Sequence, residues 1–485
     1  MSTRTEKHDK KNWIINYFLQ MDRKIKVLSS LHLFFFILIM ATGGALSYQG
    51  KVALFSFLSA MALWILTSLP AGYVAIGLIF FMIVMRAQPS EVLYHSLSEE
   101  VVWLMIGAFI IGEAFRKSGL ADRLSSFVLQ RSSNVSSALD GVSTILMLTA
   151  FFIPSTSGRA ALAKPFIGKF GERLSVKEQS LLSLLVPVII LMSTSATLIG
   201  AGSHIIGVSL LESTVGEGIS FIQWFIWGMP FAIAISALSL YVIKWKMWPK
   251  EEEMDPKVGF DADRSSQLQA EQPPFGKKEK QTILYVLLLI IGWVTESVHP
   301  FDIAFITMVG AFFFMMPTYG VISWKEGIQS VSWNLILFVA AATALGKALV
   351  GTGVVNWAQE HMLSFLGVFE SAPEWLLVLA VLIVSVTSHL YITSHTTRAV
   401  VIIPGIILFS QTVGIDPVAM VFISLIGINY CVTFPVSSKA LLLFYEEGKT
   451  SFEAKHLLKA SSILMPLYIA VVMLFYFTYW QWTGM

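Results

Sequence analysis

Charged residues are scarce in this chain of 485 residues. Asp, Glu, Lys and Arg make up 13% of it, whereas hydrophobic residues make up 55%. A soluble domain carries about 25% charged residues, so the composition excludes a string of ordinary soluble domains. Continuous apolar runs recur along almost the whole chain, and each is long enough to cross a bilayer as a helix. We therefore expect an all-α polytopic membrane protein with about eleven transmembrane helices.

Several other features are missing as well. Cys431 is the single cysteine, which excludes an internal disulfide and a cysteine-rich metal site. The net charge is +2 with no basic stripe, so no nucleic-acid partner is expected. Continuous rather than alternating apolar runs exclude a β-barrel. The chain also lacks a zinc-binding His-Glu-x-x-His motif and a serine in a glycine elbow, which argues against a membrane-embedded enzyme.

A hydrophilic stretch divides the apolar sequence into two halves. Residues 248–279 are rich in proline and glutamate, a composition that predicts a cytoplasmic linker. We expect a first half at residues 29–247 and a second half at residues 280–485. The N-terminal segment 1–28 mixes apolar and charged residues, which is typical of an amphipathic helix lying on the membrane surface.

Lysine and arginine are distributed unevenly between the expected loops. Of the 33 basic residues, 26 fall in the N-terminal segment, the linker and loops on the same side, whereas the opposite loops hold only Lys51 and Arg86. Cytoplasmic loops carry the excess of basic residues. We therefore expect a multi-pass protein of the inner or plasma membrane, with a cytoplasmic N-terminus and an extracytoplasmic C-terminus.

The remaining five basic residues fall at membrane depth, where a charge costs about 2.5–3.5 kcal/mol or more. Each of them needs an internal partner, a water-filled cavity or a route to the membrane surface. They are Arg159, Lys164, Lys347, Arg398 and Lys439.

Two apolar segments, 138–172 and 374–410, are interrupted by one polar pattern. The first contains Ser-Thr-Ser-Gly-Arg-Ala from Ser155, and the second contains Ser-His-Thr-Thr-Arg-Ala from Ser394. Each segment predicts a re-entrant hairpin with the polar residues at its tip. Basic residues flank only the first hairpin, so we expect the two to open from opposite sides as parts of inverted repeats. Inverted repeats with broken helices are typical of secondary transporters, which bind substrate near the midplane.

The predicted tips are suited to bind an anion. A helix that begins at mid-membrane presents free backbone N–H groups, and short hydroxyl side chains let a ligand approach them. Arg159 and Arg398 add planar, permanently charged donor forks that fit a carboxylate or sulfate. The alternative is that the hydroxyls bond to the i−4 carbonyls of their own helices and that the arginines snorkel to the membrane surface or pair with acidic residues.

Two further segments, 178–210 and 418–444, contain residues that would unwind a transmembrane helix. Gly200 and Gly202 interrupt the first, and Pro435 interrupts the second. Unwinding frees backbone carbonyls that could hold Na⁺. A kinked helix with buried hydroxyls is the alternative.

At these four segments the chain resembles the divalent-anion:sodium symporter family of the ion transporter superfamily. That family has two Ser-Asn-Thr hairpin tips, and its Ala-Thr-Leu-Ile-Gly segment is similar to the one that starts at Ala196. The resemblance implies an elevator-type secondary transporter of di- or tricarboxylates, with sulfate as a second choice. It also implies a homodimer and, as the only ligand besides the substrate, Na⁺ as a coupling ion.

The resemblance carries over two sets of site residues, to which the arginine argument adds two. The substrate-binding candidates, arginines included, are Ser155, Thr156, Ser157, Arg159, Ser394, His395, Thr396 and Arg398. The candidate cation-binding residues are Ser155, Thr197, Gly200, Ser394 and Thr433.

The chain departs from the family pattern at both tips. Thr156 and His395 replace the two asparagines, whose carbonyl oxygens can ligate Na⁺. Arg159, Arg398 and Lys439 could instead supply the positive charge of bound sodium. We therefore hypothesise that sodium coupling is weakened or lost, which leaves anion exchange or uniport. A cation/proton antiporter of the same superfamily is an alternative, although no acidic residue stands at the breaks.

Overall fold

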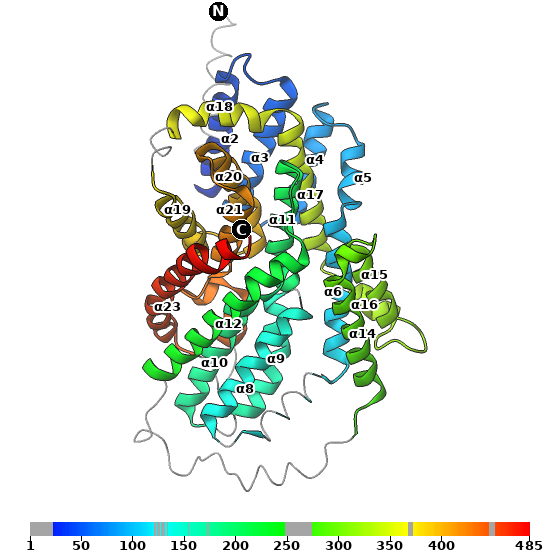
Figure 1. The fold of residues 1–485 in the computed structure, drawn as a ribbon. Helices are drawn as coiled ribbons and strands as arrows, with labels where there is room; N and C mark the ends of the chain where they lie inside the picture. The colour runs from blue at the N-terminus through cyan, green and yellow to red at the C-terminus, as the bar shows by residue number, and fades with distance from the viewer. Residues whose placement is uncertain are drawn as a thin grey trace, which may run out of the picture.

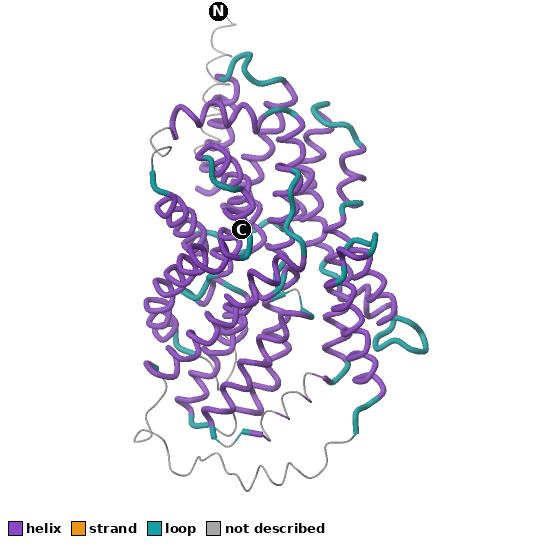
Figure 2. The backbone as a smooth tube through the Cα atoms, in the orientation of Figure 1, coloured by secondary structure: helices purple, strands orange, loops and turns teal. Residues whose placement is uncertain are grey.

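The computed structural model describes residues 23–120, 123, 127, 131–132, 134–153, 155–171, 174–247, 274–366, 372–445 and 452–485. Every regular element within these residues is helical (Figures 1 and 2). The expected interfacial helix at residues 1–28 and the linker at residues 248–279 lie largely outside the described residues.

Six helical segments of the described chain are long and apolar enough to cross a membrane. The segments are Tyr48–Leu66, Val176–Ala196, Phe221–Lys246, Trp333–Gly351, His395–Val413 and Ala454–Trp480. Six shorter apolar helices accompany them, which is what interrupted spans and hairpins produce. The chain is therefore a multi-pass membrane protein, and the expectation of eleven spans stays a prediction.

The helices form two groups that pack mainly within themselves (Figure 1). The first helix group comprises α2 (Arg23–Ala41), α3 (Tyr48–Leu66), α4 (Ala71–Val84), α5 (Glu91–Leu97), α6 (Glu100–Lys117), α14 (Lys277–Val294), α15 (Ile303–Phe314), α16 (Trp324–Ser330), α17 (Trp333–Gly351) and α18 (Val354–Leu366). The second helix group comprises α8 (Val135–Leu148), α9 (Thr156–Gly171), α10 (Val176–Met192), α11 (Gly202–Val215), α12 (Phe221–Lys246), α19 (Glu374–Thr387), α20 (His395–Val413), α21 (Pro417–Asn429), α22 (Lys439–Tyr445) and α23 (Ala454–Phe475). The two groups meet chiefly where α11 packs on α17 and α6, and where α18 packs on α20.

The second helix group contains two stretches with the same order of elements. In each, a helix ends in a short 3-10 turn, and a second helix begins after a polar tip: α8 and α9 in the first stretch, α19 and α20 in the second. A broken span follows each pair, with α10 separated from α11 and α21 separated from α22 by non-α segments. Four helices thus begin in the interior of the protein.

Local sequence explains where the outer ends of these helices lie. Helix α10 begins at a capping box, in which the Ser175 side chain accepts from the Glu178 N–H and Glu178 accepts from the Ser175 N–H at 2.8 Å. Helix α21 begins after Asp416, whose carboxylate accepts two backbone N–H groups, with Pro417 at the first helical position. Both signals are standard helix starts.

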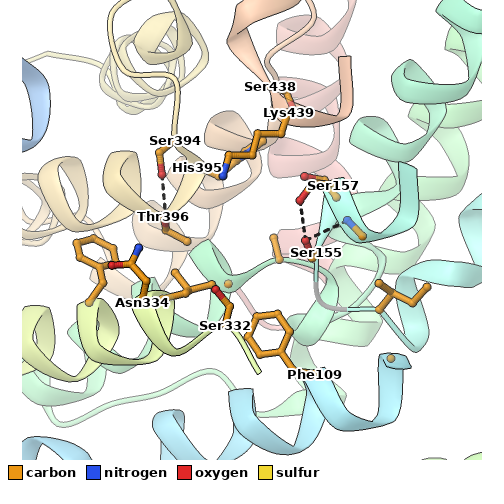
Figure 3. Close-up of a pocket in the computed structure, with 18 of the residues that line it drawn as sticks. Phe109, Ser155, Ser157, Ser332, Asn334, Ser394, His395, Thr396, Ser438 and Lys439 are labelled. Atoms are coloured by element: carbon orange, nitrogen blue, oxygen red, sulfur yellow. Dashed lines mark hydrogen bonds between the residues drawn. The ribbon is translucent and has the colours of Figure 1, made fainter. Parts of the chain in front are cut away.

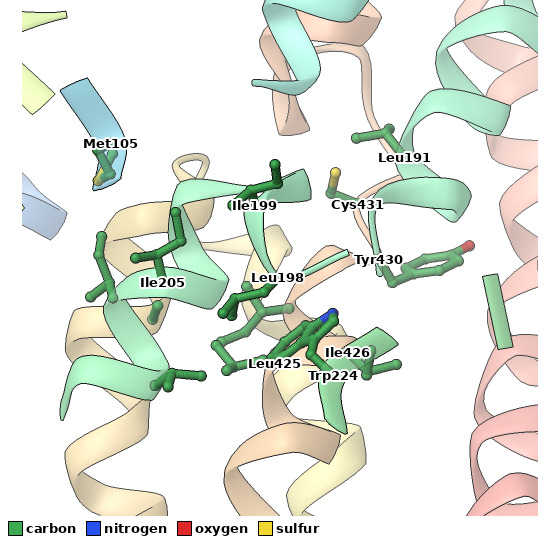
Figure 4. Packing of buried hydrophobic residues seen from close by; sticks show 14 of the residues in the cluster. Met105, Leu191, Leu198, Ile199, Ile205, Trp224, Leu425, Ile426, Tyr430 and Cys431 are labelled. Atoms are coloured by element: carbon green, nitrogen blue, oxygen red, sulfur yellow. The ribbon is translucent and has the colours of Figure 1, made fainter. Parts of the chain in front are cut away.

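The break between α10 and α11 is packed tightly against α12 (Figure 4). The buried Trp224 indole N–H donates to the Ser195 carbonyl at 3.0 Å. One turn later, a Cβ on Gly228 would lie only 2.2 Å from the same carbonyl oxygen. The absence of a side chain at Gly228 therefore allows the broken segment and α12 to touch. This contact holds the break in place.

We expect the Gly228→Ala variant to be less stable by about 1–3 kcal/mol, because the added methyl overlaps a backbone carbonyl that cannot move freely. The measurement is thermal unfolding of the detergent-purified protein. Gly405→Ala is the matched control, since Gly405 lies inside α20 with no atom within 4 Å of a built Cβ. Alanine there should leave stability unchanged or raise it by about 1 kcal/mol. Equal melting temperatures for the two variants would contradict the tight contact.

Candidate functional site

The four interior helix starts surround one cavity of about 790 Å³ (Figure 3). A cavity of this size suits a small organic ligand. The second helix group contributes Ser155, Thr156, Ser157, Gly158, Ala201, Gly202, Ser394, His395, Thr396, Ser438 and Lys439 to its lining. The first helix group contributes, among others, Phe109, Ser330, Ser332, Asn334 and Phe338.

Ser155 forms the N-terminal cap of α9. Its hydroxyl accepts from the Gly158 N–H at 3.2 Å, and its carbonyl accepts from the Arg159 N–H at 2.9 Å. The Ser155 hydroxyl also lies 3.0 Å from that of Ser157, and both hydroxyls are partly exposed to the cavity. A capping serine satisfies a free N–H group and so stabilises a helix start at this depth. The Ser157 hydroxyl lines the cavity, where a ligand could contact it.

The second tip repeats this arrangement. The Ser394 hydroxyl accepts from the Thr397 N–H at 3.3 Å and lies 2.9 Å from the Thr396 hydroxyl. His395 stands between them in the sequence, and its Nε2 lies 3.2 Å from the Cys431 Sγ. The six non-arginine residues predicted to bind substrate therefore line one cavity. Their binding of a substrate stays a prediction.

The electrostatics of this cavity favour an anion. Helices α9, α11 and α20 all begin at its wall, and none has an acidic residue in its first turn. The N-terminus of a helix carries roughly half a positive charge and free N–H donors. Glu113 is the one acidic residue in the described lining, and Arg116 pairs with it at 2.5 Å. The positive ends are therefore not neutralised by the protein around the two tips.

Arg159 is placed differently from our expectation. It does not line the cavity and is fully buried behind the first tip. Its guanidinium donates to the Thr149 hydroxyl at 2.9 Å, the Ser193 hydroxyl at 2.6 Å, and two backbone carbonyls. The carbonyls belong to Leu146 at 2.6 Å and Ile190 at 2.9 Å. Arg159 thus ties α9 to α8 and α10.

Arg398 occupies the equivalent place behind the second tip. It is also fully buried and absent from the cavity lining, and it donates to the Tyr430 carbonyl at 3.3 Å. Its Nε and Nη2 have no partner among the described residues. The expectation that Arg159 and Arg398 extend their forks toward a bound anion is therefore not met in this structure.

The candidate cation-binding residues are divided between the cavity lining and the protein around it. Ser155 and Ser394 line the cavity, whereas Thr197, Gly200 and Thr433 lie outside its lining. The Thr197 hydroxyl donates to the Ala150 carbonyl at 2.8 Å, and its own carbonyl contacts His204 Nδ1 at 3.2 Å.

The other two candidates also have protein partners. The Thr433 hydroxyl lies 2.7 Å from His389 Nε2 and 2.8 Å from the Ser461 hydroxyl. The Gly200 N–H donates to the Thr197 carbonyl at 3.0 Å. A hydroxyl that donates its proton keeps its lone pairs, so these contacts do not decide whether the residues bind a cation. Sodium binding by these residues stays a prediction.

Sequence reasoning missed the side of the cavity formed by the first helix group. Ser332 and Asn334 stand at the start of α17, and Phe338 follows one turn later. A polar pair at the start of an apolar run resembles an ordinary helix cap, so nothing local marks it as part of a site. Only the packing of α17 against α11 brings it to the tips.

Comparison with known proteins gives the family. The profile of the sodium:sulfate symporter transmembrane region matches residues 21–485. The chain belongs to the sodium:sulfate symporter family. As a member of this family it is a secondary transporter and not an enzyme.

Individual relatives of this sodium:sulfate symporter family member are distant. A citrate/succinate antiporter of Escherichia coli (strain K12) is 22% identical over 78% of this chain and 78% of its own length. A sodium-dependent dicarboxylate transporter of Staphylococcus saprophyticus is 22% identical over 82% of this chain and 81% of its own. A membrane protein of Cupriavidus necator is 26% identical over 80% of this chain and 76% of its own.

One solved structure shares the fold. The YdaH transporter of Alcanivorax borkumensis superposes with a TM-score of 0.54 at 12% identity, covering 80% of this chain and 85% of that one. At this identity the likeness concerns the fold alone.

We expect Arg159→Met to destabilise the protein by about 3 kcal/mol, because several buried acceptors lose a charged donor. Thermal unfolding in detergent measures the loss. Ser157→Ala is the comparison variant, since Ser157 lines the cavity and caps nothing. It should unfold close to wild type. A melting temperature of Arg159→Met equal to that of wild type would contradict the structural role.

Proposed function

We propose that this protein transports small divalent anions, with di- and tricarboxylates first and sulfate second. The observation that carries the proposal is the convergence of three helix N-termini and six polar side chains on one cavity. Free N–H groups and hydroxyls are donors that carboxylate and sulfate oxygens accept from. The names of the relatives, a citrate/succinate antiporter and a dicarboxylate transporter, favour carboxylates.

We further propose that transport is an exchange of anions without sodium coupling. Around Arg159, two hydroxyl and two carbonyl oxygens surround a permanent cation. Such an oxygen cage is the environment that a hard cation prefers. A tethered guanidinium therefore supplies positive charge behind the first tip, and Arg398 supplies it behind the second. A charge that is fixed to the protein is not released with the substrate. It therefore cannot couple substrate transport to a sodium gradient.

The mechanism that we infer is an elevator. In this mechanism the second helix group carries the cavity past the first helix group, and the two hairpins act as parts of inverted repeats. The support is that the two groups pack mainly within themselves and meet at few helices. We also infer a homodimer, with the linker and N-terminus in the cytoplasm, from the family resemblance and the basic loops. Light scattering in detergent tests the dimer.

Proteoliposomes test the transport itself. We expect uptake of radiolabelled succinate to require succinate or malate inside the vesicle, and to be unchanged when external Na⁺ is replaced by choline. The physical reason is that each empty carrier keeps its two buried arginines and returns only with an anion bound. Uptake that rises steeply with external Na⁺ would falsify the exchange proposal.

A variant at the tips links this activity to the cavity. Ser155→Ala with Ser394→Ala removes both hydroxyls, and Ser462→Ala, on an exposed face of α23, is the control. The double variant should exchange succinate at least about tenfold more slowly, since each lost hydrogen bond to a charged ligand costs about 1.5–3 kcal/mol. Equal rates for the double variant and the control would place the anion elsewhere.

A further inference from the structure

The basic residues at membrane depth have distinct environments. Arg159 and Arg398 are fully buried behind the tips. Lys347 forms an ion pair with Glu99 at 2.7 Å, away from the cavity. Lys439 is different, because it lines the cavity and its side chain is exposed to it. Lys164 is also absent from the lining, so Lys439 is the one of the five basic residues that lines the cavity in the described part of the chain.

The side chain of Lys439 has no counter-ion within the described part of the chain. The structure shows no ion pair or hydrogen bond from its Nζ to any described residue. Arg116 also lines the cavity but is paired with Glu113. In Figure 3 the Lys439 side chain extends from the start of α22 into the space between the two tips.

An unpaired ammonium in such a cavity is a strong determinant of the charge of the ligand. A partly desolvated cation without a partner is unfavourable, and an anion that pairs with it restores the lost interaction. The helix N-termini contribute partial charges and directed N–H donors, whereas lysine contributes one whole mobile charge. The hydroxyls and N–H groups at the tips line the same cavity as Lys439. A molecule with two anionic groups can therefore contact the tips and Lys439 at the same time.

We propose that Lys439 binds one anionic group of the transported molecule directly and thereby selects dianions over monoanions. This inference rests on the proposed transport of divalent anions. It assigns to Lys439 a direct contact with substrate, which differs from a fixed charge that merely replaces sodium.

The test compares two ligands of nearly equal shape. Succinamate is succinate with one carboxylate replaced by a neutral amide. Calorimetry on purified protein gives the dissociation constants of both ligands, at a pH where both carboxylates of succinate are ionised. In wild type succinate should bind much more tightly than succinamate. In Lys439→Gln this ratio should fall about ten- to a hundredfold, mainly through weaker binding of succinate.

Two matched variants control for structural effects. Lys459→Gln makes the same substitution at an exposed position of α23 and should keep the wild-type ratio. Lys439→Arg keeps the charge and should restore most of the preference for succinate. A Lys439→Gln protein that unfolds at the wild-type temperature but shows an unchanged ratio overturns the proposal.

Chemical modification separates charge from shape. Lys439→Cys treated with a methanethiosulfonate carrying an ethylammonium group should regain the succinate preference, and a sulfonate reagent should not. Wild type treated in parallel controls for Cys431, which is buried. Failure of the ammonium reagent to restore binding argues that the lysine is structural and overturns the proposal.

The outcomes also separate this inference from the proposed function. If wild type binds none of succinate, malate, citrate or sulfate, both fail. If wild type binds succinate and the ratio is insensitive to Lys439, only the role of the lysine fails.

Discussion

The rest of the structure depends on one constraint: backbone N–H and carbonyl groups at membrane depth must be satisfied. Lipid offers no hydrogen bonds, so a helix can begin inside the bilayer only where protein or a water-filled cavity satisfies its end. Four helices of this protein begin in its interior, and all four starts line the same cavity. The tip hydroxyls of Ser155 and Ser394 cap two of them. At this cavity, water or a ligand can satisfy the N–H groups that the caps leave free.

The carbonyl side of the same constraint explains the arginines. Where α8 and α10 end, the carbonyls of Leu146 and Ile190 accept from the Thr149 and Thr194 hydroxyls as well as from Arg159. Arg159 adds a rigid fork of donors that stays charged when buried. Positive charge thus has two roles near the cavity. The guanidinium of Arg159 donates to carbonyls at the ends of helices, and the partial charges of the helix N-termini attract an anionic ligand.

Sequence patterns predicted the class of the protein and the residues at its tips. Apolar runs and scarce charge indicated a helical membrane protein, and the repeated Ser-x-Ser/Thr-x-Arg pattern indicated the tips whose side chains line the cavity. Membership in the symporter family is confirmed by the family comparison. Such signals are local, since a helix break and a cap are encoded by neighbouring residues.

The direction of Arg159 was not accessible in this way, because its acceptors come from α8 and α10 and depend on how these helices pack. The sequence did not predict that Asn334 lines the cavity for the same reason, because its position near the tips depends on the contact of α17 with α11. Contacts between side chains of different helices can therefore be predicted only when the tertiary structure is known. Contacts within a single helical turn can be predicted from the local sequence.

The contrast between arginine and lysine at this cavity follows from their chemistry. Guanidinium has five fixed donors, so burying it is tolerable where several oxygens already surround it, as they do around Arg159. Ammonium is compact, strongly hydrated and carried on a flexible stem, which suits a position that must gain and lose a partner in each transport cycle. Lys439 is exposed to the cavity, where water can replace the ligand after release. A permanent cation locked into the fold and a movable one facing the ligand thus serve opposite needs. In the exchange that we propose, the charge of Arg159 persists when the cavity is empty, and the charge of Lys439 is neutralised when an anion is bound.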